Sequence, residues 1–181
     1  MNMKKGFSVF TSHILAIAIL FVILFVVSSQ FYAYYYNIKE EVQKSQALSI
    51  SQRVADAVLS LYTNYRKSDY EPEEGKNKTL SEIYLNLPDK ISGRDYALSL
   101  EQHEKFWVEG SMENETSSKN ERPYTSVKIE VGDSVYTYPI YNIVSVNVSG
   151  SVKMADRIKI SYIRKRENEE TEDLITMERI S

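Results

Sequence analysis

The hydrophobic positions of this chain form two patterns: a long apolar run near the start and short alternating segments later. The apolar run is unbroken from Ile14 to Val27. A helix counted from Phe7 to Val27 would be about 31 Å long, which matches the hydrocarbon thickness of a bilayer. Lys4 and Lys5 precede the run and no acidic residue does, so we expect the N-terminus to stay cytoplasmic. The pattern predicts a transmembrane helix at 7–30 with the remainder of the chain exported.

The helical pattern continues beyond this run. An aromatic group follows the span directly, at Phe31, Tyr32, Tyr34, Tyr35 and Tyr36. Such rings favour the headgroup region of a bilayer, and packing against neighbouring helices is the alternative. From Asn37 to Tyr65 there is neither Gly nor Pro, and apolar residues recur at helical spacing, at Ile50, Val54, Val58, Leu61 and Tyr65. We therefore expect one helix from about Ser8 to Arg66. Its continuation at 31–66 should be amphipathic, with the apolar stripe against a head domain and a polar face that includes Ser51, Gln52, Arg53 and Asp56.

After the helix the period changes to about two. A polar segment at 67–79 with Pro72 and Gly75 predicts a linker. Alternating apolar and polar residues then predict a β-rich extracellular head at 80–181, with strands at 82–87, 96–100, 105–109, 125–131, 134–138, 143–148, 157–162 and 174–177. Gly132 and Asp133 predict a hairpin turn, and polar loops are expected at 110–123 and 164–173. The fold class is α+β, a long helix packed on an antiparallel sandwich-like or curved sheet.

Composition limits the chemistry that this chain can perform. It has 181 residues, no cysteine and a net charge of -3, so neither disulfides nor thiolate sites are available and nothing favours a nucleic-acid partner. Its two histidines are His13, at the edge of the span, and His103, which we place in a loop. No phosphate-binding glycine loop, nucleophile elbow or paired-histidine motif occurs. We expect no enzyme activity, no metal and no cofactor.

Three Asn-x-Ser/Thr sequons begin at Asn77, Asn114 and Asn147. Asn77 and Asn114 lie in predicted polar loops, where a glycan could be accommodated. Asn147 lies in a predicted strand. We therefore predict Asn77 and Asn114 as the candidate glycosylation sites.

The motif Lys4-Lys5-Gly6-Phe7 directly before an apolar helix resembles the prepilin signal of type IV pilins, and in particular the class III signal peptides of archaeal pilin-like proteins. The resemblance implies that a prepilin peptidase removes residues 1–6 by cutting between Gly6 and Phe7. It also implies that the apolar helix is kept as the membrane and assembly element, through side chains such as Ile14, Leu15, Ile17, Leu20, Phe21, Leu24 and Phe25. A weaker Leu-Pro, Ile, Gly, Tyr pattern at 87–96 is similar to segments that follow the helix in archaeal pilin-like proteins.

Two alternatives for the N-terminal segment stay open: an uncleaved anchor, and a secretory signal removed near Val27-Ser28-Ser29. Pilins that build filaments usually carry a glutamate five residues into the mature chain. Thr11 occupies that position here, which is compatible with a minor or accessory subunit.

These patterns predict a pilin-like structural or accessory subunit of a type IV pilus-like or archaellum-like assembly. Its partners would be the prepilin peptidase, the lipid bilayer, and other pilin-like subunits or a membrane assembly platform. The alternative is a single-pass, membrane-anchored extracellular module that binds a surface-layer or cell-wall protein. An archaellum-associated stator-like protein would fall between the two.

Overall fold

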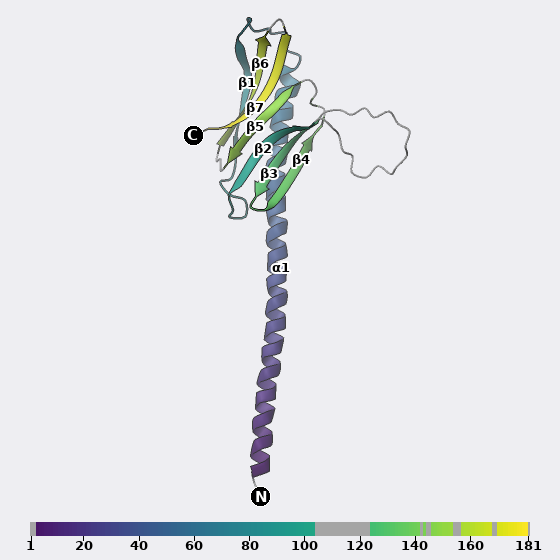
Figure 1. Ribbon diagram of the computed structural model, residues 1–181, viewed down its shortest axis with the longest axis vertical. Coiled ribbons are helices and arrows are strands. Elements are labelled where there is room, and N and C mark those ends of the chain that lie inside the picture. The colour runs from purple at the N-terminus through teal and green to yellow at the C-terminus, as the bar shows by residue number, and fades with distance from the viewer. Residues whose placement is uncertain are drawn as a thin grey trace, which may run out of the picture. The chain divides into compact units, whose positions relative to one another are not determined.

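The computed structural model describes residues 3–103, 124–141, 143, 146–153, 157–167 and 170–180, with side chains from residue 11 onward. The chain forms two compact units, Met1–Val42 and Gln43–Ser181. The predicted strand at 105–109 and most of the predicted loop at 110–123 lie outside the described residues. Figure 1 labels the elements of both units.

One helix, α1, begins at Met3 and ends at Tyr65. No Gly or Pro lies between Phe7 and Tyr65, so no residue removes a helical hydrogen bond or weakens the helix. The prediction of one continuous helix is confirmed, and it begins earlier than the predicted Ser8. The second unit starts at Gln43, so only the last part of the predicted 31–66 continuation belongs to it.

The second unit contains seven strands in a single sheet. They are β1 (Asn77–Asn86), β2 (Tyr96–His103), β3 (Tyr124–Val131), β4 (Ser134–Ile140), β5 (Asn147–Lys153), β6 (Arg157–Glu167) and β7 (Glu170–Arg179). The strand order is β1-β6-β7-β5-β2-β3-β4. All neighbours pair antiparallel except β5 and β7, which run parallel.

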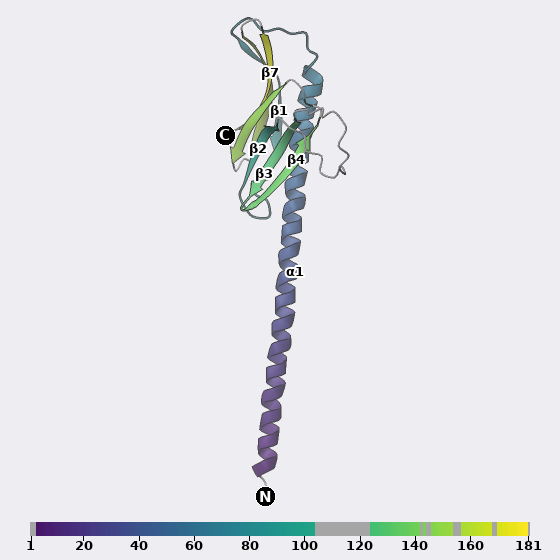
Figure 2. The same cartoon turned by 45° about the vertical axis from the view of Figure 1, so that its right-hand side comes forward.

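Within this unit, the final part of α1 runs along one face of the sheet, as Figures 1 and 2 show. The predicted stripe is confirmed, because Ile50, Val54, Val58 and Leu61 are buried. Facing side chains of the sheet complete the core, among them Leu98, Leu100, Val127, Ile129, Ile158, Ile160, Tyr162, Ile175 and Met177. The α+β fold class is therefore as predicted.

Ser51 is a correction to the predicted polar face. Its side chain is fully buried. Ser51 precedes Val54 by three positions and Val58 by seven, so at 3.6 residues per turn it lies on the buried side of the helix.

The strand boundaries also differ from the prediction. The first strand begins at Asn77, inside the predicted linker, and β2 extends to His103, which is not in a loop. The fifth strand is displaced from 143–148 to Asn147–Lys153. Its middle contains Ser149, Gly150 and Ser151, which give no alternating apolar signal.

The charged loop predicted at 164–173 is wrong. Strand β6 continues to Glu167 and β7 begins at Glu170, so most of these residues form a long antiparallel hairpin. A run of charged residues is typical of a loop, but in the hairpin the charges pair across and along the strands. Lys165, for example, forms an ion pair with Glu167 at 2.6 Å.

Candidate functional sites

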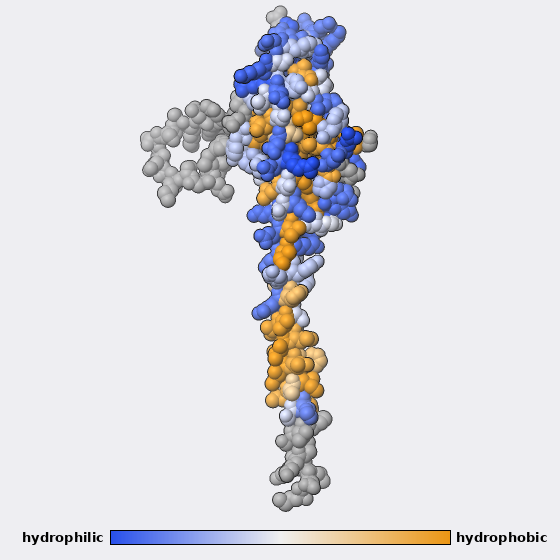
Figure 3. Space-filling view, turned by 180° about the vertical axis from the view of Figure 1, so that it is seen from behind, coloured by the Kyte–Doolittle hydropathy of each residue, from blue (hydrophilic) through white to orange (hydrophobic). Residues whose placement is uncertain are grey.

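The first candidate site is the apolar surface of α1 in the first unit. All seven predicted assembly residues, Ile14, Leu15, Ile17, Leu20, Phe21, Leu24 and Phe25, are between 51% and 75% exposed. Figure 3 shows this stretch as a band of hydrophobic surface. An exposed apolar surface of this extent marks a contact with lipid or with other protein surfaces. The helix thus contains a possible membrane span.

The aromatic group lies next along the same helix. Its five rings, Phe31, Tyr32, Tyr34, Tyr35 and Tyr36, are between 57% and 72% exposed. At about 100° per residue these positions cover an arc of roughly 200° around the helix. A single packing stripe would be narrower, so the arrangement favours an interfacial belt over a one-sided helix contact.

The processing motif lies at the beginning of α1. The backbone of Lys4, Lys5, Gly6 and Phe7 is helical, within the first turns of α1.

Two of the three sequons lie in the described part of the chain. Asn77 is exposed at the start of β1, and the other residues of its sequon, Lys78 and Thr79, are exposed as well. Asn114 lies outside the described residues. Asn147 is exposed at the start of β5, and its amide donates a hydrogen bond to Glu172. Exposure therefore agrees with the choice of Asn77 and does not separate it from Asn147.

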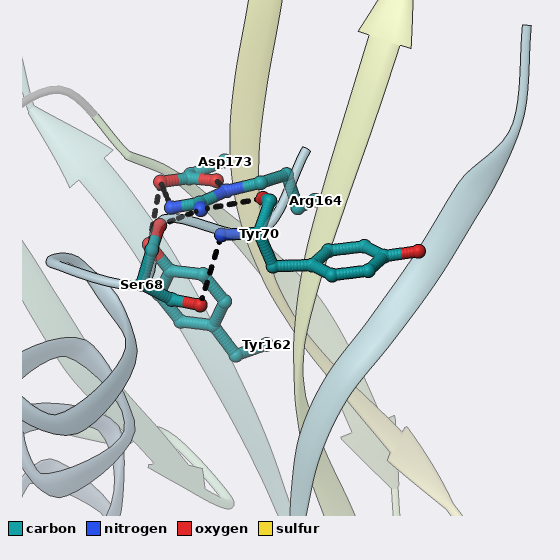
Figure 4. Close-up of polar contacts among 5 residues, drawn as sticks. All are labelled: Ser68, Tyr70, Tyr162, Arg164 and Asp173. Carbon is teal, nitrogen blue, oxygen red and sulfur yellow. Dashed lines mark hydrogen bonds and ion pairs between the residues drawn. The ribbon is translucent and has the colours of Figure 1, made fainter. Parts of the chain in front are cut away.

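The second candidate site is a buried ion pair between β6 and β7, drawn in Figure 4. Arg164 donates from Nε to Asp173 Oδ1 at 2.7 Å and from Nη2 to Oδ2 at 3.0 Å. The Tyr162 hydroxyl donates to the same carboxylate at 2.6 Å. The side chains of Arg164 and Asp173 are only 7% and 15% exposed. Two parallel hydrogen bonds give this pair a fixed geometry.

The same guanidinium also binds the segment that follows α1. Its Nη1 donates to the backbone carbonyls of Ser68 and Tyr70, the latter at 3.0 Å. Nearby, Arg166 of β6 contacts Glu71 at 3.3 Å, and its carbonyl accepts from the Gly75 amide at 3.1 Å. These contacts fasten the connection between α1 and β1 to the sheet.

The electrostatics of the pair follow from its contacts. Burial of the Asp173 carboxyl acts to raise its pKa, but the hydrogen bonds from Arg164 and Tyr162 and the charge of Arg164 outweigh burial, and the pKa is lowered. The hydrogen bond to Asp173 raises the pKa of Arg164, and burial raises the pKa of the Tyr162 hydroxyl. The charged forms of both partners are thereby stabilised. The donors and acceptors of the cluster form hydrogen bonds with one another, so we assign the cluster a structural role.

The face of the sheet opposite α1 carries ion pairs centred on two lysines. Lys159 lies 3.3 Å from Glu82 and 2.5 Å from Glu178, on the neighbouring strands β1 and β7. Lys128 lies 3.1 Å from both Glu101 and Glu130. The hydrogen bond to Glu178 is the main cause of a raised pKa at Lys159, and that to Glu130 at Lys128. This face is a solvated surface on which each of the two lysines pairs with two glutamates.

His103 lies beside a serine hydroxyl, an arrangement that can serve acid–base chemistry. Its Nε2 lies 2.8 Å from the Ser126 hydroxyl, and its ring stacks on Tyr124 with centroids 4.6 Å apart. A histidine and a serine at this distance can share a proton. However, Ser126 is fully buried, so no substrate can reach its hydroxyl. The pair is an internal hydrogen bond of the sheet.

Comparison with known proteins adds no assignment. No protein-family model, curated protein or solved structure matches this chain. Among the described residues, no three His, Asp or Glu side chains are placed to hold a metal ion.

Sequence reasoning missed the Arg164 cluster, although a signal for it exists. Residues at the same parity on a strand share a face. Arg164 therefore shares a face with the buried Ile158, Ile160 and Tyr162. An arginine that continues an apolar series in this way predicts a buried ion pair, and the structure places its partner, Asp173, on the adjacent strand β7.

Proposed function

We propose that this protein is a pilin-like structural or accessory subunit of a type IV pilus-like or archaellum-like surface assembly. The observation that carries the proposal is the change of environment along α1. Side chains from Ile14 to Val27 are exposed and apolar, whereas Ile50, Val54, Val58 and Leu61 are buried in the core of the sheet unit. One helix thus supplies both an apolar outer surface and a core element of the folded unit.

This arrangement suits a subunit that is held by its helix and displays its sheet. The exposed apolar side chains require lipid or the helices of other subunits as neighbours. A subunit that first resides in the bilayer and then enters an assembly would contact lipid in the first state and the helices of other subunits in the second. The resemblance of Lys4-Lys5-Gly6-Phe7 to class III signal peptides supports processing between Gly6 and Phe7. In this proposal the protein has no enzymatic activity, and its sheet unit is extracellular.

Processing at Gly6 is the direct test. We expect the mature wild-type protein to begin at Phe7, and a Gly6→Val variant to begin at Met1, because a branched side chain beside the cut would block the peptidase. Thr11→Val is the control, since it introduces the same residue inside the helix, away from the cut, and should begin at Phe7. N-terminal sequencing and intact mass of protein recovered from membranes measure all three. A Gly6→Val protein that still begins at Phe7, or a wild-type protein that begins at Met1 or near Gln30, would contradict the proposal.

A second candidate function is a membrane-anchored extracellular binding module for a surface-layer or cell-wall protein. Thr11 favours it, because filament-forming pilins usually have a glutamate at this position. The two functions differ in where the mature protein is found. A subunit of an assembly is recovered with filaments sheared from cells, whereas a tethered module stays with the membrane fraction.

A further inference from the structure

The connection between α1 and β1, residues 66–76, forms a strap that a single arginine of β6 holds against the sheet. Figure 4 shows the Arg164 guanidinium between the Asp173 carboxylate and the backbone of Ser68 and Tyr70. Its Nε and Nη2 donate to Asp173, and its Nη1 donates to the two carbonyls of the strap. The carboxylate of β7 therefore fixes the group that binds the strap.

Further contacts between the strap and the sheet lie at the surface. Arg166 contacts Glu71 at 3.3 Å, with side chains that are 32% and 69% exposed, and exposed ion pairs contribute little. The Lys78 ammonium lies 3.9 Å from the centre of the exposed Tyr70 ring. One backbone hydrogen bond joins the Gly75 amide to the Arg166 carbonyl. The buried contacts of Arg164 are thus the strongest link between strap and sheet.

The strap contributes little to the hydrophobic core. Within residues 66–76, all of which the structure describes, Pro72 is the only buried residue. None of the core side chains comes from this segment. Opening the strap therefore exposes little apolar surface, whereas unfolding the sheet exposes the whole core. A segment with so few buried contacts opens at a lower cost in free energy than the complete unit.

The groups that face Asp173 determine its response to acid. Burial acts to raise its pKa, but the hydrogen bonds from Arg164 and Tyr162 of β6 lower it. On the other side of β7, strand β5 contributes Asn147, which carries no charge and donates to Glu172. The strap itself presents two uncharged carbonyls. Protonation of Asp173 thus leaves the Arg164 guanidinium buried without a counter-charge.

We propose that the charge of Asp173 holds the strap closed, and that the strap opens when this charge is lost while the sheet unit stays folded. A guanidinium without its carboxylate regains contact with water, and the strap is the neighbour that moves away at the lowest cost. Opening of the strap concerns the sheet unit alone and needs neither processing nor a filament, so it is independent of the proposed function.

The sign of the pH dependence follows from proton uptake. Asp173 has a lowered pKa in the closed form, so the open form binds a proton more readily. The strap is therefore closed at neutral pH. The ratio of open to closed form rises about ten-fold per pH unit as the pH falls from about 3.9, the ordinary pKa of an aspartate, towards the lower pKa of the closed form.

Two pairs of spin labels on the detergent-solubilised full chain test this opening. The chain has no cysteine, so pairs of cysteines can be introduced without background. Glu73→Cys with Thr137→Cys measures the distance from the strap to β4. Asn86→Cys with Thr137→Cys is the matched control, because it joins the two edge strands of the sheet. All three positions are exposed, and double electron–electron resonance gives the distribution of each distance.

At pH 7 we expect both distributions to be narrow in the wild-type background. Asp173→Asn removes the charge and keeps the shape of the side chain, so it should broaden the strap distribution and leave the edge-to-edge distribution narrow. Asp95→Asn removes an exposed charge and should broaden neither. In the wild-type background the strap distribution should broaden below about pH 4, whereas in Asp173→Asn it should be broad at every pH.

Four results would overturn the proposal. A narrow strap distribution in Asp173→Asn at pH 7, or in the wild-type background at pH 3, would show that loss of the charge does not open the strap. Broadening of both distributions together would show that the sheet unfolds with it. A strap distribution that still responds to acid in Asp173→Asn would show that a different group controls the opening.

Discussion

At the scale of single residues, Arg164 and Asp173 form the most buried ion pair among the described residues. Removing one partner of such a pair leaves the other charge buried without compensation. We expect Asp173→Asn, which keeps the shape of the side chain, to lower the free energy of unfolding by about 3 kcal/mol. Urea denaturation of the detergent-solubilised protein, followed by tryptophan fluorescence or circular dichroism, measures this change.

Asp95→Asn is the control for that variant. Asp95 pairs with Lys90 at 3.8 Å, and both side chains are more than half exposed. Exposed pairs contribute little, so we expect a change within about 0.5 kcal/mol. If both variants lowered the free energy of unfolding equally, burial would not be the reason why Asp173 contributes to stability.

The lowered pKa of Asp173 predicts a dependence of stability on pH. A carboxyl group whose pKa is lower in the folded state binds protons more readily when unfolded. Its contribution is therefore complete above the unfolded pKa of about 3.9 and is lost as the pH falls through the folded pKa. We expect the difference in melting temperature between wild type and Asp173→Asn to be largest near pH 7 and to shrink below about pH 4. A difference that stays constant down to pH 3 would contradict this assignment.

At the scale of elements, the packing of α1 on the sheet depends on its buried stripe. Leu61 is 1% exposed, whereas Leu59, two positions earlier, is 39% exposed. We expect Leu61→Ala to reduce the free energy of unfolding by about 3 kcal/mol, because it removes apolar contacts and leaves a cavity. Leu59→Ala should change it by less than about 1 kcal/mol. Denaturant unfolding of both variants tests the contrast, and similar losses would mean that the stripe has been assigned to the wrong face.

The elements that sequence reasoning predicted well are those with a strong local signal. The helix α1 has an uninterrupted helical composition, and the hairpin of β3 and β4 has clear alternation around Gly132 and Asp133. The missed parts depend on neighbours in the sheet. In β5, a Cβ at Gly150 would lie 2.5 Å from the Met177 carbonyl oxygen, so the close approach of β7 requires a residue that gives no strand signal.

The charged hairpin of β6 and β7 was missed for a related reason. In the sequence, its polar residues have the composition of a solvated loop. In the structure they lie in two strands, where their side chains form cross-strand pairs. The candidate sites divide in the same way. The exposed apolar helix was evident from composition, whereas the contact of Arg164 with Asp173 depends on a strand pairing that alternation alone does not specify.

At the scale of the whole molecule, the two units differ in the solvent they require. The side chains of the first unit from Ile14 to Val27 are apolar and exposed, while the sheet of the second unit has a polar face that carries ion pairs. An apolar surface has a lower free energy in lipid than in water, and a charged surface has a lower free energy in water than in lipid. This difference supports a chain that is divided between membrane and aqueous solution.

The orientation of that division is the last prediction, and single cysteines can test it. Lys4 and Lys5 favour a cytoplasmic N-terminus, so the second unit should lie outside the cell. We expect a membrane-impermeant maleimide to label Thr79→Cys on intact cells, because Thr79 is exposed on β1. Ser8→Cys, which both processed and unprocessed forms retain, should react only after the membrane is dissolved. Labelling of Ser8→Cys but not Thr79→Cys on intact cells would reverse the orientation, and with it exclude a surface role for the sheet unit.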